Sequence, residues 1–274
     1  MSLDTLNNGD SGLDARTKIN AAIAAIENKS VLPRSYISGM IMVYNTSTLL
    51  NVSAGVCRDD TDTYDITLNT IIKDISSNFV AGSGNGGLQI GLTLTVNTNY
   101  SVWVIKETTS GSVDVMFSTS ASAPTLPGTF DAKRRIGWVR YGAGAIQQFI
   151  QKGDCLRYVN GPIDSFGTSL IGTASSDTLI TLSAPPDVLT TFRFYGTCSA
   201  GTWLVRLAMT ADASNITVNN LFTTFAGSGT ANPDAGQATL LTDASSQIRA
   251  RASGGTVSFT ASTLGWIDTR GRDD

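Results

Sequence analysis

The stretch TWLVRLAMT, residues 202–210, decides the fold class of this chain because its side chains alternate in character. In an extended strand, alternate residues share one face. One face here carries Trp203, Val205, Leu207 and Met209, and the other carries Leu204, Arg206 and Ala208. The same alternation returns in VSFTA, residues 257–261. Such runs predict strands that are buried on one side.

The composition around these runs argues against helices in the same part of the chain. The 274 residues include 29 Ser, 35 Thr and 27 Gly, whereas only 15% are charged. Between residues 155 and 274 there is no Lys and no Glu, so strong surface helix formers are missing. Turn signals recur about every 8–12 residues, as in sandwiches and jelly rolls. We therefore expect residues 167–274 to form an all-β, C-terminal β-sandwich domain.

Short apolar or alternating runs also fill residues 37–151, with Gly, Asn, Asp and Ser between them. They predict strands at 37–44, 64–68, 92–96, 101–106, 113–118, 135–141 and 146–151, whereas 71–79 fits a strand or a helical turn. We expect a first β-domain over residues 35–153 and a linker over 154–166. The expected fold class is mainly β, with a short N-terminal α-helix followed by two antiparallel β-sandwich or jelly-roll-like domains.

One helical pattern lies near the start of the chain, within an N-terminal segment of residues 1–34. Asp10 or Ser11 can cap a run that extends to about residue 28. Ile19, Ile23 and Ile26 follow a 4–3 spacing, which places them on one stripe of the helix. A helix this short is marginal alone, so the stripe predicts docking on the chain's own body or bundling with other copies. A homotrimer is the expected oligomer.

Several classes of protein are excluded or disfavoured by composition. There is no His, which removes Ser-His-Asp and Cys-His catalysis and His-bearing metal sites. The net charge of −3 supplies no broad positive field, so nucleic acid is not an expected partner. Three cysteines without C-x-x-C spacing indicate neither a disulfide framework nor a zinc site. No secretory signal and no membrane-spanning run is present, so we expect a soluble chain made in a cytoplasm.

Two motifs could hold a cofactor or a metal. Residues 82–87 match G-x-G-x-x-G, but the following residues alternate like a strand, so a Gly-rich hairpin or bulge is favoured over a dinucleotide site. Asp59, Asp60, Asp62 and Asp65 could bind Ca²⁺, but their spacing lacks the EF-hand register. A solvated turn is favoured there. We expect no cofactor and no metal.

The candidate sites that remain concern binding rather than catalysis. The Asp residues are scattered singly and nominate no pair for glycoside hydrolysis, so no catalytic residue is expected. The richest cluster near the end could bind a sugar, or it could close the core and form ion pairs; it comprises Trp266, Asp268, Arg270 and Arg272. Arg134 and Arg135 could contact an acidic partner, although structural ion pairs are favoured.

Three segments of the sequence resemble the tail-fibre-like and receptor-binding structural proteins of tailed bacteriophages. They are NNGDSGLDARTKINAAIAAI at 7–26, KDISSNFVAGSGNGGLQIG at 73–91 and TDASSQIRARASGGTVSFTASTLGWIDTRGR at 242–272. The chain departs from the resembled pattern at Gln89, where Asp is usual, and in the insert at about 220–236. The resemblance implies a virion component that displays β-domains as a symmetric homo-oligomer, with the N-terminal helix as its attachment or bundling end.

The expected function is therefore that of a phage virion structural protein, a tail fibre or receptor-binding component in host attachment, rather than an enzyme. Its expected partners are other virion proteins, copies of itself and a glycan of the host cell surface, without membrane insertion. Two alternatives stay open: a capsid or tail decoration protein that binds the particle itself, and a fibre-borne glycan hydrolase.

Overall fold

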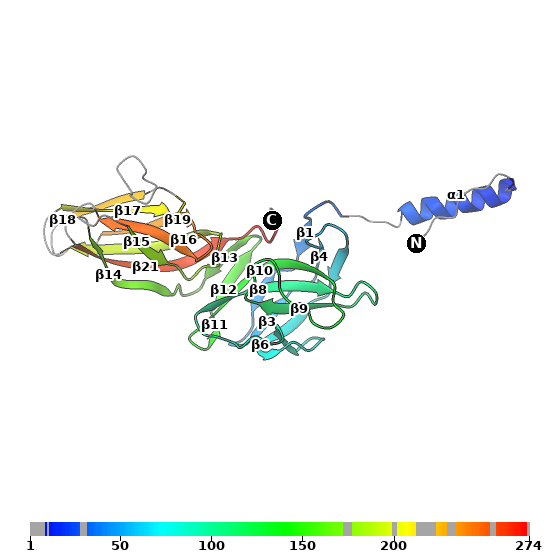
Figure 1. Cartoon of the computed structure of the whole chain (residues 1–274), viewed down its shortest axis with the longest axis horizontal. Coiled ribbons are helices and arrows are strands. Elements are labelled where there is room, and N and C mark those ends of the chain that lie inside the picture. The colour runs from blue at the N-terminus through cyan, green and yellow to red at the C-terminus, as the bar shows by residue number, and fades with distance from the viewer. Residues whose placement is uncertain are drawn as a thin grey trace.

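The structure is a computed structural model that describes residues 9, 11–27, 32–171, 177–198, 202–211, 223–228, 234–252 and 256–272, without the side chains of 22–27, 198, 202–204, 223–228 and 234. It is mainly β and has one helix among these residues, α1 (Gly12–Glu27), which lies apart from the strands (Figure 1). The mainly β class with a short N-terminal helix is thus confirmed. In the described part of the chain, no helix combines the length and hydropathy needed to span a membrane.

The first large sheet has eight strands and nearly closes on itself. In spatial order they are β11 (Ala145–Ile146), β10 (Ala132–Gly142), β8 (Thr98–Lys106), β9 (Val113–Ser118), β7 (Gly86–Leu88), β6 (Ile71–Asn78), β3 (Leu49–Val52) and β2 (Met42–Tyr44). The Ile146 N–H donates to the carbonyl of Ser47 at 2.6 Å, which joins β11 to the turn between β2 and β3. The two edges of the sheet therefore meet, and the sheet is barrel-like.

A three-stranded sheet packs beside this barrel-like sheet. It contains β1 (Ile37–Gly39), β4 (Gly55–Arg58) and β5 (Asp65–Leu68), in that order. Its apolar residues join one core with those of the larger sheet, including Cys57, Ile66, Leu50, Val52 and Tyr100, all fully buried. Residues 71–79 form β6 almost throughout, so the strand interpretation is correct there.

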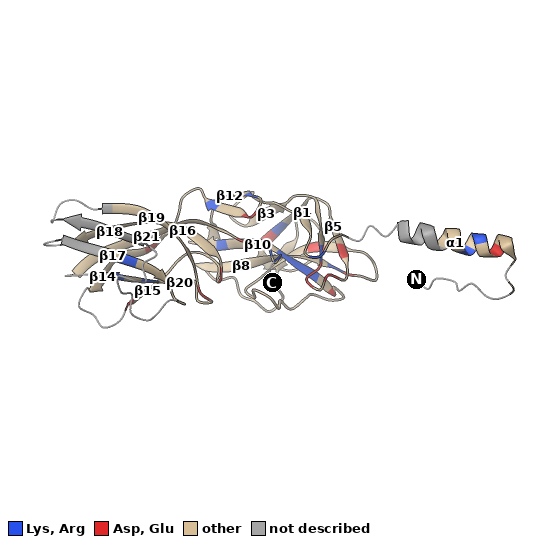
Figure 2. Cartoon of the chain, turned by 90° about the horizontal axis from the view of Figure 1, so that it is seen from above, with Lys and Arg blue, Asp and Glu red and all other residues tan. Residues whose placement is uncertain are grey.

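The later strands form two further sheets. A six-stranded sheet runs β12 (Phe149–Lys152), β13 (Cys155–Tyr158), β21 (Thr256–Ile267), β16 (Leu189–Cys198) and β19 (Asp234–Leu241), with β14 (Ile163–Ile171) also on β21. A four-stranded sheet runs β15 (Thr178–Thr181), β20 (Gln247–Ala252), β17 (Thr202–Met209) and β18 (Thr223–Ser228). The predicted alternation holds in β17 over Val205–Leu207, whereas Ala208, expected on the opposite face, is also fully buried. Figure 2 shows these strands mostly without charge.

Three sequence expectations differ from the observed elements. Residues 154–166, expected as a linker, contain β13 and the start of β14, because Cys155 to Arg157 pair with β21. Residues 92–96 are not a strand: Leu92 and Leu94 pack on the core, but the Thr95 N–H donates to the hydroxyl of Tyr100 instead of a neighbouring strand. Pairing is not antiparallel throughout, since β7 lies parallel to β6 and to β9.

Candidate functional site

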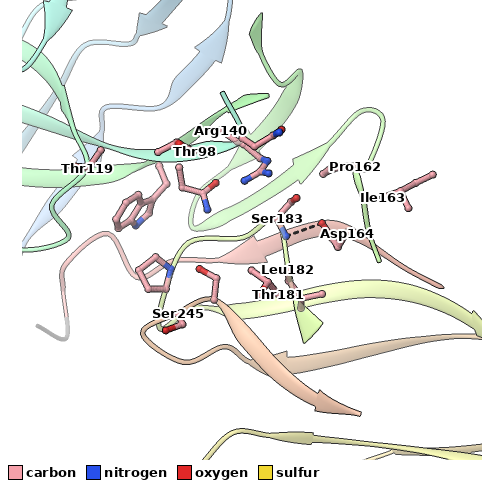
Figure 3. Close-up of a pocket in the computed structure, with 15 residues that line it drawn as sticks. Thr98, Thr119, Arg140, Pro162, Ile163, Asp164, Thr181, Leu182, Ser183 and Ser245 are labelled. Carbon is pink, nitrogen blue, oxygen red and sulfur yellow. Dashed lines mark hydrogen bonds between the residues drawn. The ribbon is translucent and has the colours of Figure 1, made fainter. Parts of the chain in front are cut away.

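A cavity of about 590 Å³ lies between the barrel-like sheet and the later strands (Figure 3). The barrel-like part contributes side chains from β8, β10 and the loops beside β8 and β9, and the later part contributes β14, β15 and three connecting segments. The two sides meet directly, because the Asn99 side-chain amide donates to the carbonyl of Ala184 at 2.6 Å. Hydroxyl groups line much of the wall, from Thr98, Thr119, Thr181, Ser183, Ser245 and Ser246.

Two buried polar atoms at this cavity have no hydrogen-bond partner among the described residues. One is the indole Nε1 of Trp138, whose side chain is 2% exposed, and the other is Oδ1 of Asn99. Buried polar atoms in native proteins are nearly always paired, with protein or with a bound molecule. Trp138 and Asn99 thus carry one unused N–H donor and one unused carbonyl acceptor, and both atoms lie beneath the accessible surface of the cavity wall.

The two charged groups of the cavity do not neutralise each other. Arg140 projects from β10 toward Ser183 and Asp164 (Figure 3), yet in the described part of the chain no carboxylate lies within ion-pair distance of its guanidinium. Both Asp164 oxygens have other partners: Oδ1 accepts from the Ser183 N–H at 2.8 Å and Oδ2 accepts from the Thr263 hydroxyl at 2.6 Å. Burial raises the pKa of the Asp164 carboxyl above its ordinary value.

The cluster predicted as a sugar site at the end of the chain lies mainly in the interior. Trp266 is 2% exposed and packs edge-on against Tyr158, with ring centroids 5.3 Å apart. The Arg270 guanidinium donates to the carbonyls of Ile136, Gly39 and Met40. Burial lowers the pKa of Arg270 to about 10. These groups are engaged within the chain and present little surface, so the prediction that they bind a ligand receives no support from their surroundings.

The remaining members of that cluster form ion pairs across the molecule. Both carboxylate oxygens of Asp268 accept hydrogen bonds from Nη1 of Arg135, at 2.8 and 2.9 Å, and both side chains are buried. Arg272 pairs with Asp154. The neighbouring Arg134 donates to the carbonyl of Arg270 at 3.1 Å. The structural interpretation of the arginine pair therefore agrees with the observed contacts, which connect β10 to the segment after β21.

The glycine-rich motif encloses a buried lysine. The Lys73 Nζ donates to the carbonyls of Val80 at 2.8 Å and Gly82 at 3.1 Å, and lies 3.1 Å from Oδ1 of Asp114. The Gly82 N–H donates to Oδ2 of Asp114 at 2.6 Å. A strand, β7, follows the loop instead of a helix, so no helix N-terminus faces a pyrophosphate here. Burial lowers the pKa of Lys73 below its ordinary value.

The four aspartates of residues 59–65 each have separate partners. Asp59 caps its own turn by accepting from the N–H groups of Thr63 and Tyr64, both at 2.7 Å. Asp60 pairs with Lys133, Asp62 with Arg34 and Asp65 with Arg58. Within the described ranges, no group of His, Cys, Asp or Glu side chains gathers as metal ligands would. The turn interpretation matches these contacts.

The helix presents part of its predicted apolar stripe to solvent. Ser11 caps α1, since its Oγ accepts from the Asp14 N–H at 3.2 Å. Leu13 is 72% exposed and Ile19 is 44% exposed. The side chains of Ile23 and Ile26 lie outside the described residues, so the oligomerisation prediction for these positions stays a prediction.

Sequence reasoning missed the cavity residues for an identifiable reason. Trp138 and Arg140 stand in the run RIGWVRY, which alternates like any half-buried strand, and Asp164 stands in an expected linker. Only tertiary packing brings residues of β10 and β14 to one cavity. The spare polar groups of Trp138 and Asn99 leave no trace in the sequence.

Comparison with known proteins supplies little. No family model and no curated protein matches this chain. Among solved structures, an isomalto-dextranase of Arthrobacter globiformis T6 complexed with panose is 18% identical, with a TM-score of 0.21, over 82% of this chain and 35% of that one. The IBDV T13 viral particle gives 12% identity and a TM-score of 0.21 over 90% and 74% of the chains. Similarities this weak carry no argument about fold or function.

Proposed function

We propose that this chain is a structural protein of a bacteriophage virion, a tail-fibre or receptor-binding component that attaches the particle to a glycan of the host cell surface. The observation that carries the proposal is the hydroxyl-lined cavity of about 590 Å³, which falls within the usual size range of ligand sites. Its six Ser and Thr hydroxyls and the Arg140 guanidinium suit the alternating hydroxyls of a sugar.

The chemistry of the cavity favours binding over hydrolysis. Glycoside hydrolysis needs two carboxyl groups about 5–10 Å apart. Asp164 is the only carboxylate among the residues that line this cavity, and both of its oxygens are already hydrogen-bonded. The cavity therefore supports a binding protein rather than a fibre-borne glycan hydrolase.

The helix supports display of several copies together. We propose that α1 bundles in a homotrimer through the stripe of Ile19, Ile23 and Ile26, next to other virion proteins. Exposed Leu13 and Ile19 would then be covered by partner helices. Several weak glycan sites held on one particle bind a cell surface much more strongly than one site alone.

Two β domains complete the proposal. The strands up to Ile146 belong to the first two sheets, and those from Phe149 onward belong to the last two. This division supports one β domain on each side of about residue 148, joined by the buried Arg135–Asp268 pair. The second domain resembles a β-sandwich because its six-stranded and four-stranded sheets share one apolar core.

A competition experiment tests the attachment role. Purified full-length chain should reduce adsorption of the phage that carries it to host cells, in proportion to its concentration, because both would occupy the same receptor. Chain heated beyond its unfolding transition serves as the control. Unchanged adsorption at saturating chain would contradict the proposal, and binding only to particles that lack the chain would support decoration instead.

Mass measurement in solution tests the helix. We expect the full chain to be trimeric and a variant without residues 1–30 to be monomeric, since the deletion removes the whole apolar stripe. Light scattering coupled to size exclusion gives both masses. A monomer in both cases would reject bundling by α1.

A further inference from the structure

We infer that the cavity between the two halves of the β body binds a sugar residue that carries a carboxylate, such as a uronic acid, and that Arg140 pairs with this carboxylate. The inference rests on the proposed function, because it names the chemical class of the host glycan. It assigns ligand-binding roles to Arg140, Trp138 and Asn99, none of which stands out in the sequence.

The charge of the cavity is the first argument. Arg140 is half-buried and its guanidinium has neither an ion pair nor a hydrogen bond to a described residue. A guanidinium cannot shed its charge at physiological pH, so a half-buried one without a partner favours an anion. The planar fork of its N–H groups matches the two oxygens of a carboxylate.

The acid of the cavity does not cancel this preference. Asp164 is held by the Ser183 N–H and the Thr263 hydroxyl, and its carboxylate is not within ion-pair distance of Arg140. Burial raises the pKa of Asp164, which reduces the cost of leaving it protonated near an anionic ligand. Among the described residues that line the cavity, the Arg140 guanidinium is therefore the charged group without a hydrogen-bond or ion-pair partner.

The neutral polar groups argue for a sugar rather than a bare anion. The Trp138 Nε1 donor and the Asn99 Oδ1 acceptor have no partner in the described chain and lie beneath the accessible surface of the wall, where the indole would donate to a sugar hydroxyl and the amide oxygen would accept from one. Six Ser and Thr residues surround them. Asn99 is held in place by its own amide, which donates to Ala184. Bound hydroxyls would thus meet groups already oriented by the fold.

The backbone at the edge of the cavity is also unusual. Asn97 and Ser246 both line the cavity and both have left-handed backbone angles, with φ of 58° and 59°. The angle is one that Asn adopts readily, and at Ser246 it belongs to a turn that the Ser246 N–H closes on the carbonyl of Asp243. Asn97 and Ser246 come from opposite halves of the β body, so both halves shape the opening.

Titration with matched sugars tests the inference on the unmodified chain. D-glucuronic acid should bind at least about 10-fold more tightly than D-glucose, since a charge-assisted hydrogen bond is worth at least one decade of affinity. Raising NaCl from about 0.05 M to about 0.5 M should weaken glucuronate binding and leave glucose unchanged. Isothermal titration calorimetry and saturation-transfer NMR measure both. Equal affinity for the two sugars would overturn the inference.

Variants locate the binding groups. Arg140→Gln should weaken glucuronate binding about 10-fold and leave glucose binding unchanged. Trp138→Phe should weaken both sugars alike, because it removes only the indole donor. Arg193→Gln is the matched control, since Arg193 is exposed on the later strand β16. Arg140→Lys, which keeps the charge, should retain most of the preference for glucuronate if Arg140→Gln fails to fold.

Two results would overturn the inference separately from the proposed function. Wild-type glucuronate affinity in folded Arg140→Gln would remove Arg140 from the site. Acetate binding as tight as glucuronate binding would show that the hydroxyl contacts contribute nothing. Either result leaves the adsorption experiment unaffected, whereas a chain that binds glucuronate but never competes with particles would reject the attachment role alone.

Discussion

The loop around Lys73 and the cavity around Arg140 each contain a cationic side chain, but the two cations differ in their hydrogen-bond and ion-pair partners. Lys73 is completely buried, and its ammonium reaches two backbone carbonyls and the carboxylate of Asp114. Arg140 is half-buried beside open volume and lacks such partners in the described chain. A buried charge is tolerated only when it is paired and hydrogen-bonded. The comparison separates a cation that holds the fold from a cation available to a ligand.

The ion pair of Lys73 lies beneath the loop that leads into the parallel strand β7. The Gly82 N–H and the Lys73 ammonium both reach Asp114, so the loop between β6 and β7 folds over a single ion pair. That wrapping returns the chain alongside β6 in the same direction. Among the described residues that line the cavity, no ion pair crosses it, and its two sides are joined by the hydrogen bond from Asn99 to the carbonyl of Ala184.

The largest difference in stability is expected when Lys73 and Arg140 are replaced one at a time. Lys73→Met should destabilise the chain by about 3–5 kcal/mol, because Asp114 would remain buried without its counter-charge. The matched variant Arg140→Met should change stability by only about 0.5 kcal/mol, because no internal partner is lost. Urea unfolding followed by tryptophan fluorescence measures both. Equal losses would show that Arg140 is structural.

Adding one methyl group near Lys73 and another near Arg140 compares how tightly the chain packs around the two cations. A Cβ at Gly87 would lie 2.8 Å from the ring of Phe117 and 3.3 Å from Cβ of Lys73. Gly87→Ala should therefore cost about 1–3 kcal/mol through overpacking. A Cβ at Gly142 meets nothing closer than Gln147 Oε1 at 3.5 Å, so Gly142→Ala should be nearly neutral. Thermal melts of the two variants compare them, and a reversed order would contradict the tight packing around Lys73.

The smallest expected effect is on the pH dependence of stability and involves Asp164. Its folded-state pKa is raised, so its contribution to stability is complete below the ordinary Asp pKa and is lost as pH rises through the folded value. Asp164→Asn keeps an acceptor for the Ser183 N–H and does not titrate. The variant should gain stability relative to wild type between acidic and neutral pH. Unfolding in urea at pH 4 and pH 7 gives this difference, and a constant difference would contradict a raised pKa.

Alternation within a segment predicted several strands, but it could not predict the contacts between segments that decide which strands form. Alternation identified β17 and β21, but the strand expected over residues 88–96 is absent, because β7 ends at Leu88 and β8 begins at Thr98. The strand that alternation predicts at residues 92–96 does not form, because the Thr95 N–H donates to a side chain instead of a neighbouring strand. Ladder hydrogen bonds depend on a neighbouring strand, which periodicity within one segment cannot supply.

The sites were less predictable because their members are far apart in the sequence. Arg135 and Asp268 are separated by 133 residues, so neither residue suggested the other. Trp266 and its neighbours looked like a sugar site because they are adjacent in sequence, yet the fold uses them internally. The cavity assembles from residues that are unremarkable in their own segments, and it exists only where the barrel-like sheet meets the later strands.

Strand β21 has a consequence for the order in which the chain can fold. It pairs with β13, β14 and β16, and Arg270 just after it reaches back 231 residues to Gly39. Contacts this distant in sequence form slowly, because closing the intervening loop costs entropy before any pairing repays it. During synthesis, until residues 256–267 leave the ribosome, β14 lacks its partner and β13 and β16 each keep an unpaired edge. Such edges recruit other chains, so a nascent chain at this stage depends on dilution or chaperones to avoid aggregation.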